Sequence, residues 1–373
     1  MNELKKSLIF VCFIIVCILT YIVIVGTYEF GSKVKVLERE SVTQHTEKEI
    51  TGTQYDIVKE NILICTDEDI KLKNLVNNNV LWNEKINIQN RIYKKAKDKI
   101  VIASKYGYKI LLFNEKGKMV GFNTRHPIVD IELNNSGYMS VIQEDGDKNL
   151  ITVYNSKAQK IIERTTFVDK SGRMMCCALS EDNTYLTIAY LRASGDGISS
   201  DIEFLNIKDE GLIDHIYATK TYKDRIIYEV RYHNDNNLFA LSDKEIYEIN
   251  ILNDVIRSEL LESNLEMYFL DEYENKLIGI LNNKSDTAKA SLVIYDMSTL
   301  KPKNVEIKEE VTYFKYDKGN IITNQKNMIY CFNLNGDIAW KIKSPQPFSQ
   351  ILFINQSKIM VVSGDKNIIY NVR

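Results

Sequence analysis

One short pattern recurs along most of the chain and limits its fold more than any other feature. Each copy is a short apolar strand that ends near an aromatic or aliphatic residue plus Asn or Asp, often followed by a turn with glycine. The copies begin at Asp69, Lys109, Leu150, Asp201, Glu245, Ser291, Met328 and Asn367. Because their starts lie 37 to 51 residues apart, close to the length of a four-stranded blade, the chain is predicted to be an all-β propeller.

The segments between the copies supply the other strands that such blades need. Most are short, rich in Ile, Val, Leu and Tyr, and bounded by turn-forming residues. Second strands are predicted to begin at Lys99, Tyr138, Tyr185, Asn237, Lys276, Asn320 and Lys358. Innermost strands are predicted to begin at Ile128, Arg173, Ile226, Val311 and Ser349. A sheet that is apolar on both faces needs a neighbour on each side, so the blades are expected to close into a ring.

The number of copies predicts eight blades, with seven as the alternative. The last copy, from Asn367, is followed by no outer strand in this sequence. The missing strand must come from the region between Val42 and Val58, or from the first copy. If the first copy only completes the last blade, the ring has seven blades.

An apolar segment precedes the repeats. Residues 7–26 contain no charged side chain, and a helix of this length can cross the hydrocarbon core of a membrane. The run is longer than the core of a secretory signal peptide, so we expect an uncleaved signal-anchor. Residues 1–6, with Lys5 and Lys6, are expected to be a cytoplasmic tail, residues 27–54 a stalk, and residues 55–373 an extracytoplasmic propeller domain at the cell membrane.

The composition argues against nucleic acid as a partner. Lysine and arginine total 48, aspartate and glutamate total 50, and the net charge is −2. Nucleic-acid binding needs clustered cations against phosphate, and no such excess is present.

The cysteines show no metal-ligand spacing such as C-x-x-C. Cys176 and Cys177 are neighbours, which point to opposite faces of a strand. They are interpreted as small core residues. A disulfide between Cys65 and Cys331 is the alternative if the two ends of the domain meet.

The loop from Ser194 to Asp201 is the most suggestive local feature. It is acidic and rich in glycine, and such loops can hold calcium through carboxylate and carbonyl oxygens. Asp196 and Asp201 are therefore candidates for metal ligands, in a loop that lacks the EF-hand spacing. The alternative is a flexible hairpin between two strands of a blade.

No catalytic residue is predicted from motifs. Nucleophile-elbow, zinc-protease, P-loop and dinucleotide-binding patterns are absent from suitable contexts. The four histidines, His45, His126, His215 and His233, are far apart in the sequence. They are interpreted as stalk, loop or blade-edge residues.

Two tryptophan segments resemble a known blade motif. FNLNGDIAW, which ends at Trp340, is similar to the N/D-x-x-G-x-x-x-W pattern of pyrroloquinoline-quinone-like propellers. NLVNNNVLW, which ends at Trp82, is similar but lacks the glycine. Two tryptophans are too few for the docking motifs of a quinone dehydrogenase, so neither bound quinone nor another cofactor is expected.

The middle of the chain resembles an uncharacterised bacterial family of membrane-anchored β-propellers with quinoprotein- or WD40-like repeats. The matching segments are VYNSKAQKII, ALSEDNTYLTIAY and SGDGISSDIEFLN. The resemblance covers most of the chain after residue 55. It implies a fold and no particular activity, because propellers host many unrelated functions.

Two hypotheses for the function follow. The first is a binding scaffold, in which a rigid ring tethered by one helix displays a surface to a protein or a cell-wall polymer. The second is a propeller-type enzyme, a hydrolase or lyase that acts on a carbohydrate or lactone. The enzyme hypothesis requires carboxylates or histidines that converge on the centre of the ring.

Overall fold

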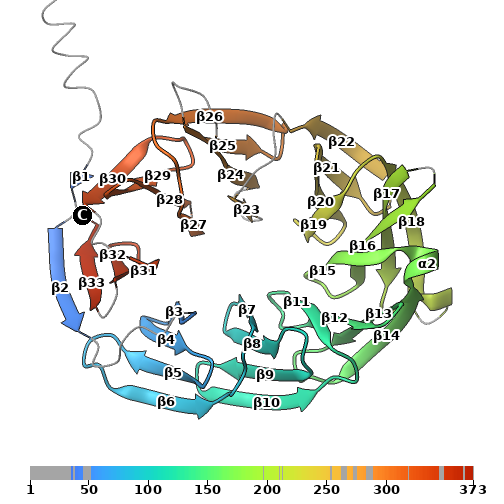
Figure 1. The fold of residues 1–373 in the computed structure, drawn as a ribbon, viewed down its shortest axis with the longest axis horizontal. Coiled ribbons are helices and arrows are strands. Elements are labelled where there is room, and N and C mark those ends of the chain that lie inside the picture. The colour runs from blue at the N-terminus through green and yellow to red at the C-terminus, as the bar shows by residue number, and fades with distance from the viewer. Residues whose placement is uncertain are drawn as a thin grey trace, which may run out of the picture.

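The computed structural model describes residues 35–36, 38–44 and 52–372, apart from short gaps at 196, 210, 212, 253, 262–266, 272–274, 283–288, 318, 344–347 and 364–365. These residues form eight sheets that stand side by side around a ring (Figure 1). The prediction of an all-β propeller with eight four-stranded blades is therefore confirmed, and the seven-bladed alternative is wrong.

Blades one to four each run in sequence order from the inner to the outer strand. Blade one is β3 (Gln54–Val58), β4 (Asn61–Cys65), β5 (Asp69–Asn74) and β6 (Val80–Lys85). Blade two is β7 (Arg91–Ala96), β8 (Lys99–Ser104), β9 (Lys109–Asn114) and β10 (Gly117–Asn123). Blade three is β11 (Ile128–Leu133), β12 (Met139–Asp145), β13 (Lys148–Tyr154) and β14 (Lys160–Phe167). Blade four is β15 (Arg173–Leu179), β16 (Tyr185–Ser194), β17 (Gly197–Asn206) and β18 (Ile216–Lys223).

Blades five to seven repeat this arrangement. Blade five is β19 (Ile227–Tyr232), β20 (Asn237–Ser242), β21 (Glu245–Asn250) and β22 (Asp254–Leu260). Blade six is β23 (Met267–Asp271), β24 (Lys276–Asn282), β25 (Ala290–Asp296) and β26 (Lys301–Ile307). Blade seven is β27 (Phe314–Asp317), β28 (Asn320–Gln325), β29 (Met328–Phe332) and β30 (Ile338–Lys343). Two one-turn helices, α2 (Val168–Ser171) and η1 (Ile213–His215), lie between strands.

Blade eight is built from both ends of the described chain. It contains β31 (Gln350–Asn355), β32 (Lys358–Ser363) and β33 (Lys366–Asn371), and its outer strand is β2 (Glu38–Gln44). β2 pairs antiparallel with β33, with Glu38 opposite Asn371 and Gln44 opposite Lys366. β1 (Lys35–Val36) adds a short parallel strand to β30.

The closing strand corrects the predicted stalk. We assigned residues 27–54 to a stalk, but β1, β2 and the start of β3 lie in this range and belong to the blades. The sequence pattern missed β2 because residues 38–44, ERESVTQ, are mostly polar. The strand lies at the outer edge of a blade, where an apolar run is not needed. The first copy of the repeat is the third strand of blade one and does not close the ring.

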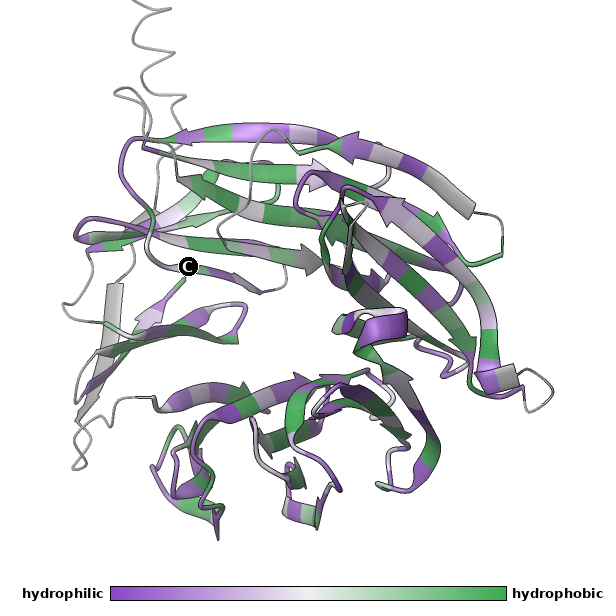
Figure 2. Cartoon of the chain, turned by 45° about the vertical axis from the view of Figure 1, so that its right-hand side comes forward, coloured by the Kyte–Doolittle hydropathy of each residue, from purple (hydrophilic) through white to green (hydrophobic). Residues whose placement is uncertain are grey.

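The hydrophobic core lies between the blades. The described residues form eight apolar clusters, and each joins two neighbouring blades. The last of them packs Tyr55 and Ile62 of blade one against Leu352 and Met360 of blade eight. Middle strands carry consecutive buried apolar residues for this reason, as in β8 and β9. Figure 2 shows hydrophobic segments in the strands and hydrophilic segments at many connections.

The recurrent Asn or Asp of the sequence pattern is the last residue of the third strand, or the residue directly after it, in each of blades one to seven. Its side-chain Oδ1 accepts a hydrogen bond from the backbone N–H two residues later, at 2.8–3.1 Å. The residues are Asn74, Asn114, Asn155, Asn206, Asn250, Asp296 and Asn333. This Asx turn pairs a backbone group that would otherwise lack a partner, and it starts the turn to the fourth strand.

The two tryptophans occupy equivalent places in fourth strands. Trp82 stacks on Phe113 of blade two, and its indole Nε1 donates a hydrogen bond to the Glu115 carbonyl at 2.9 Å. Trp340, only 2% exposed, lies in the cluster between blades seven and eight. Four residues earlier, Gly336 has φ of +72° and Asn78 has φ of +61°. Asn78 therefore adopts the left-handed conformation that glycine adopts in the motif, which explains why the motif near Trp82 works without glycine.

The four cysteines of the described region are free and buried. Cys65 lies in blade one and Cys331 in blade seven, so the alternative disulfide between them is not formed. Cys176 and Cys177 point into different clusters, as expected for strand neighbours.

Residues 7–26, which we predict to cross the membrane, lie outside the described residues. Within the part of the chain that the structure describes, no helix has the length and apolar character needed to span a bilayer.

Candidate functional site: the loop face and the inner strands

The two sides of the ring carry different connections. We call the loop face the side with the turns between second and third strands and the connections between blades. We call the turn face the opposite side, with the turns between first and second and between third and fourth strands. Antiparallel strands place these two sets of connections on opposite sides.

Two exposed tyrosines stand on the loop face of blade two. Tyr106 is 65% exposed and Tyr108 is 49% exposed, in the turn between β8 and β9. Tyr106 has φ of +61°, a conformation that is uncommon for a residue with a bulky side chain. Backbone hydrogen bonds hold it there: Tyr106 N donates to the Ile128 carbonyl at 2.7 Å, and Ile128 N donates to the Gly107 carbonyl at 2.8 Å. The turn is therefore fixed to the start of blade three.

The Tyr108 carbonyl is fixed in the same way. It accepts hydrogen bonds from the backbone N–H of Thr124 at 2.8 Å and from its hydroxyl at 3.1 Å. Lys105 lies over the Tyr106 ring, with its Nζ 5.5 Å from the ring centroid. The result is a pair of exposed aromatic rings on a constrained backbone, which is typical of a binding surface.

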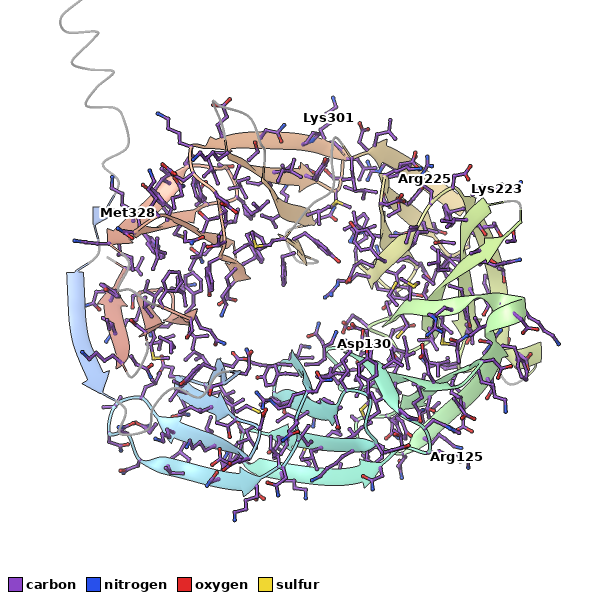
Figure 3. The ribbon with its side chains drawn as sticks, viewed as in Figure 1. Arg125, Asp130, Lys223, Arg225, Lys301 and Met328 are labelled. Carbon is purple, nitrogen blue, oxygen red and sulfur yellow. The ribbon has the colours of Figure 1, made fainter. Side chains whose placement is uncertain are left out.

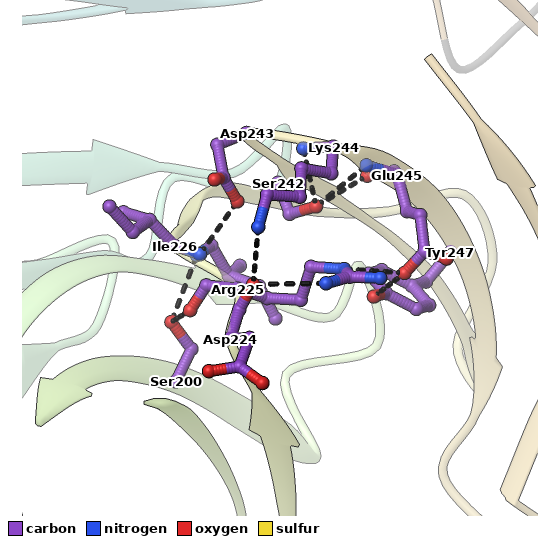
Figure 4. Close-up of polar contacts among 10 residues, drawn as sticks. Ser200, Asp224, Arg225, Ile226, Ser242, Asp243, Lys244, Glu245 and Tyr247 are labelled. Carbon is purple, nitrogen blue, oxygen red and sulfur yellow. Dashed lines mark hydrogen bonds and ion pairs between the residues drawn. The ribbon is translucent and has the colours of Figure 1, made fainter. Parts of the chain in front are cut away.

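Polar side chains also hold the loop face rigid at blade five (Figure 4). Arg225 Nε donates to the Glu245 carboxylate at 2.8 Å, and the Tyr247 hydroxyl donates to the same carboxylate. The Arg225 partner holds the pKa of Glu245 below its usual range. Asp243 accepts a hydrogen bond from the backbone of Ile226 at 2.9 Å. The connection from blade four to blade five is thereby joined to the turn between β20 and β21.

The predicted metal loop also lies on the loop face, in the turn between β16 and β17. Asp196 lies outside the described residues. Asp201 is 4% exposed, its carboxylate forms an ion pair with Arg192, and Thr221 Oγ1 donates to it at 2.6 Å. Among the described residues no three His, Cys, Asp or Glu side chains are grouped as metal ligands. Calcium binding by this loop stays a prediction.

Charged side chains line the inner strands, mostly as pairs between blades. Lys94 of β7 contacts Glu132 of β11 at 2.5 Å. Burial acts to lower the pKa of Lys94, but Glu132 and Asp130 outweigh burial, so the pKa is raised and the side chain stays cationic. Asp130 lies at the inner edge of the ring (Figure 3). Its Oδ1 accepts a hydrogen bond from the backbone of Ile131 at 2.8 Å.

Two further acids of the inner strands are engaged in the same manner. Asp56 of β3 accepts hydrogen bonds from the Tyr93 hydroxyl at 2.8 Å and from Lys95 Nζ at 2.9 Å. Glu229 of β19 contacts Arg231 at 3.0 Å and the Tyr268 hydroxyl at 3.4 Å. Burial raises the pKa of Tyr93, with Asp56 acting in the same direction. These contacts neutralise most of the carboxylates and join neighbouring blades near the axis.

The described histidines do not join the acids of the inner strands. His126 lies beside Asp145 on the loop face, with Nδ1 3.7 Å from the carboxylate. His215 Nδ1 lies 3.2 Å from the Asn206 carbonyl, and the His233 ring stacks on Phe239. Both are on the turn face. Carboxylates do lie near the axis, as the enzyme hypothesis requires, but most of them are paired with cations. None of the described histidines lies among them.

The exposed aromatic pair on the loop face, Tyr106 and Tyr108, was not predicted from the sequence. A signal was present, since KYGYK between two apolar strands places a glycine between two aromatic residues in a turn. Exposed apolar side chains that are grouped, and not scattered singly, are the ones that mark interaction surfaces. The sequence contains no comparable signal for the ion pairs of the inner strands, because the partners of most of these pairs lie on different blades.

The fold and these surfaces define the class: the chain is an eight-bladed β-propeller with a constrained loop face. It belongs to a family of unknown function, DUF5711, whose model matches residues 33–370. A search of the curated proteins gave no match to the chain.

Solved structures of low sequence identity share the fold. Saccharomyces cerevisiae Sqt1 is similar with a TM-score of 0.57 and 11% identity, over 90% of this chain and 99% of that chain. Chaetomium thermophilum Sqt1 bound to the N-terminus of the ribosomal protein L10 is similar with a TM-score of 0.52 and 10% identity, over 84% and 93% of the two chains. The Neurospora crassa Pan2 WD40 domain is similar with a TM-score of 0.48 and 7% identity, over 76% and 88%. At this identity the likeness shows the fold alone.

Proposed function

We propose that this protein is a membrane-anchored, extracytoplasmic scaffold whose loop face binds another protein. The observation that carries the proposal is the pair of exposed rings, Tyr106 and Tyr108, on a backbone fixed by hydrogen bonds to the next blade. Aromatic residues on a rigid surface provide contact area at little cost in conformational entropy. A cell-wall polymer is the other partner that the sequence analysis left open.

A similar propeller supports a protein as the partner. Chaetomium thermophilum Sqt1, which shares the fold, was solved in complex with the N-terminus of a ribosomal protein. A propeller of this build is thus able to hold a segment of another protein. The binding residues are not inferred from Sqt1. In the present chain we propose that they include Tyr106 and Tyr108.

The membrane anchor in this proposal is the apolar segment of residues 7–26. Only eight residues, 27–34, separate it from β1, and an extended chain of that length reaches about 28 Å. β2 starts at Glu38 opposite Asn371, beside the turn between β31 and β32, and therefore enters the ring from the turn face. The turn face is then next to the membrane, and the loop face points away from it toward partners.

Site-specific photo-crosslinking tests the proposal. A photoreactive phenylalanine derivative replaces Tyr106 in the full-length protein in its native membrane, and products are identified by mass spectrometry. The control carries the same group at Tyr217, which is exposed on the outer strand β18. We expect a discrete protein adduct from position 106 and none from position 217. Equal adducts from both positions, or none from position 106, would overturn the proposal.

A further inference from the structure

A pocket of about 610 Å³ lies on the loop face between blades six, seven and eight. The described part of its lining comes from the segment between β26 and β27, from Phe348 and Ser349 before β31, from Lys289 before β25, and from Asn324 and Lys326 at the end of β28. Pockets of this size accept small ligands. None of its lining residues belongs to the inner ion pairs or to the aromatic pair of blade two.

An aromatic pair forms the apolar part of the pocket. Tyr313 and Phe348 contact edge to face, with ring centroids 5.2 Å apart and an angle of 71° between the rings. Tyr313 is held at both ends. Its backbone N–H donates to Asn324 Oδ1 at 2.7 Å, and its hydroxyl oxygen accepts a hydrogen bond from Ile351 N at 2.9 Å.

Among the described residues, the Tyr313 hydroxyl has one hydrogen-bond partner, the Ile351 N–H, for which it acts as the acceptor. Burial raises the pKa of Tyr313 to about 12, although the Ile351 N–H acts in the opposite direction. The phenol is therefore neutral near pH 7 and keeps its O–H donor. A fixed ring with a donor at its edge is suited to a ligand that has an apolar face and polar edges.

The polar part of the pocket contains hydrogen-bond donors and acceptors and charged side chains of both signs. Glu309 contacts Lys326 at 2.5 Å, and this contact holds the pKa of Glu309 below its usual range. Glu310 and Lys289 also line the pocket, so its two acids and two lysines balance in charge. Thr312, Asn324 and Ser349 add neutral polar groups. The two lysines would repel a cationic ligand, and the two carboxylates would repel an anionic ligand. The balance of charge therefore favours a neutral ligand.

From this combination we infer that the pocket binds a neutral saccharide. A sugar ring has an apolar C–H face, which packs on an aromatic ring, and hydroxyls around its edge that both donate and accept hydrogen bonds. The Tyr313–Phe348 pair provides an aromatic surface for the C–H face of the sugar. Glu310, Lys289 and Thr312 provide hydrogen-bonding groups for the hydroxyls at its edge. The inference is independent of a protein partner at Tyr106, which lies on blade two.

The test is calorimetric titration of the full-length protein in nanodiscs with chitotriose, cellotriose and maltotriose, and separately with a lysine-rich peptide. We expect one of the trisaccharides to bind in the millimolar range, which corresponds to about 4 kcal/mol. Phe348→Ala should weaken binding at least about tenfold through loss of the stacking surface. Glu310→Gln should weaken it several-fold, and because Glu310 is exposed on the surface this variant keeps the fold intact. The control is Tyr217→Ala, which removes an exposed ring from another aromatic pair and should change nothing.

Two results would overturn the inference. One is the absence of heat with every trisaccharide up to about 10 mM, well above the expected dissociation constant. The other is binding of the lysine-rich peptide that Phe348→Ala abolishes, which would make the pocket a peptide site. Crosslinking at Tyr106 reports separately on the protein partner, so the two proposals fail independently.

Discussion

At the scale of single residues, the side chain that ends each third strand explains why the repeats are visible in the sequence. An Asx turn needs a short side chain with an acceptor at one defined position, and Asn or Asp meets this need. Asn155 is a clear example, since its Oδ1 accepts from the backbone of Lys157 at 2.9 Å and of Gln159 at 3.0 Å. The repeated Asn or Asp in the sequence therefore marks hydrogen bonds between residues that are close together in the chain.

Replacement of Asn155 should therefore cost measurable stability. Asn155→Ala leaves two backbone N–H groups without their acceptor, and we expect a loss of about 1 kcal/mol in the free energy of unfolding. Asn155→Asp keeps the acceptor and should cost less. Urea unfolding followed by tyrosine fluorescence measures both. The matched control is Asn123→Ala, at an exposed residue that ends β10. A loss as large at Asn123 as at Asn155 would contradict the Asx-turn explanation.

Asp296 makes one of these turns sensitive to pH. Hydrogen bonds from Lys276 and Ser298 lower its pKa to about 2. A carboxyl with a depressed pKa in the folded state contributes stability above its unfolded pKa, near 4, and this contribution is lost as pH falls toward 2. Asp296 is well exposed, so the effect should be less than about 1 kcal/mol.

Asp296→Asn keeps the turn acceptor and removes the charge. Its free energy of unfolding should therefore fall less than that of the wild type between pH 4 and pH 2. Urea titrations at each pH give the comparison. Parallel curves for the two proteins across this range would show that the contact with Lys276 contributes nothing.

At the scale of elements, one strand decides whether the blades form a closed ring. β2 supplies the outer strand of blade eight, and six residue pairs are in register between it and β33. Blade eight would otherwise expose the unpaired edge of β33.

Loss of β2 should open the ring. Replacement of residues 38–44 by a glycine–serine segment keeps the backbone groups but raises the entropic cost of the extended conformation that pairs with β33, and we expect a loss on the order of 3 kcal/mol. Thermal unfolding should occur at a lower temperature and become less cooperative. The same replacement of residues 27–34, before β1, is the control and should leave the transition unchanged. An unchanged transition after the replacement of residues 38–44 would show that β2 does not close the ring.

At the scale of the whole molecule, the ring separates two faces of different character. The loop face carries the exposed pair of blade two and the aromatic pocket of blades six to eight. The turn face carries the Asx turns and the point where β2 enters. In the membrane-anchored arrangement that we propose, the turn face is the one next to the lipid.

Energy transfer to labelled lipids tests this arrangement. Single cysteines replace Lys157 on the turn face and Asp147 on the loop face, in full-length protein whose Cys12 and Cys17 are serine. The buried native thiols should not react, and burial raises the pKa of Cys65 to about 11. In nanodiscs we expect stronger transfer from position 157 than from position 147. Stronger transfer from position 147 would reverse the proposed orientation.

Much of the fold could be predicted because its signals are local. Strand alternation and turn residues are properties of a few consecutive positions, so the third strand of every blade was recognised. The innermost strands near Ile128, Arg173, Ile226 and Ser349 were recognised for the same reason. β27 begins at Phe314, three residues after the predicted start, because Thr312 and Tyr313 bind the side chain of Asn324 before the strand begins.

The sequence by itself determined the class of fold, the positions of the repeated strands and the chemistry of the turns, and it left the number of blades at eight or seven. Only the tertiary structure decided which strand closes the ring, which acids are paired across blades, and where an aromatic pocket forms. The physical reason is separation along the chain: β2 pairs with β33 and Asp56 with Lys95, and Tyr313 meets Phe348 on a connection beyond its own blade. No local pattern marks such contacts, because they exist only once the blades stand next to one another.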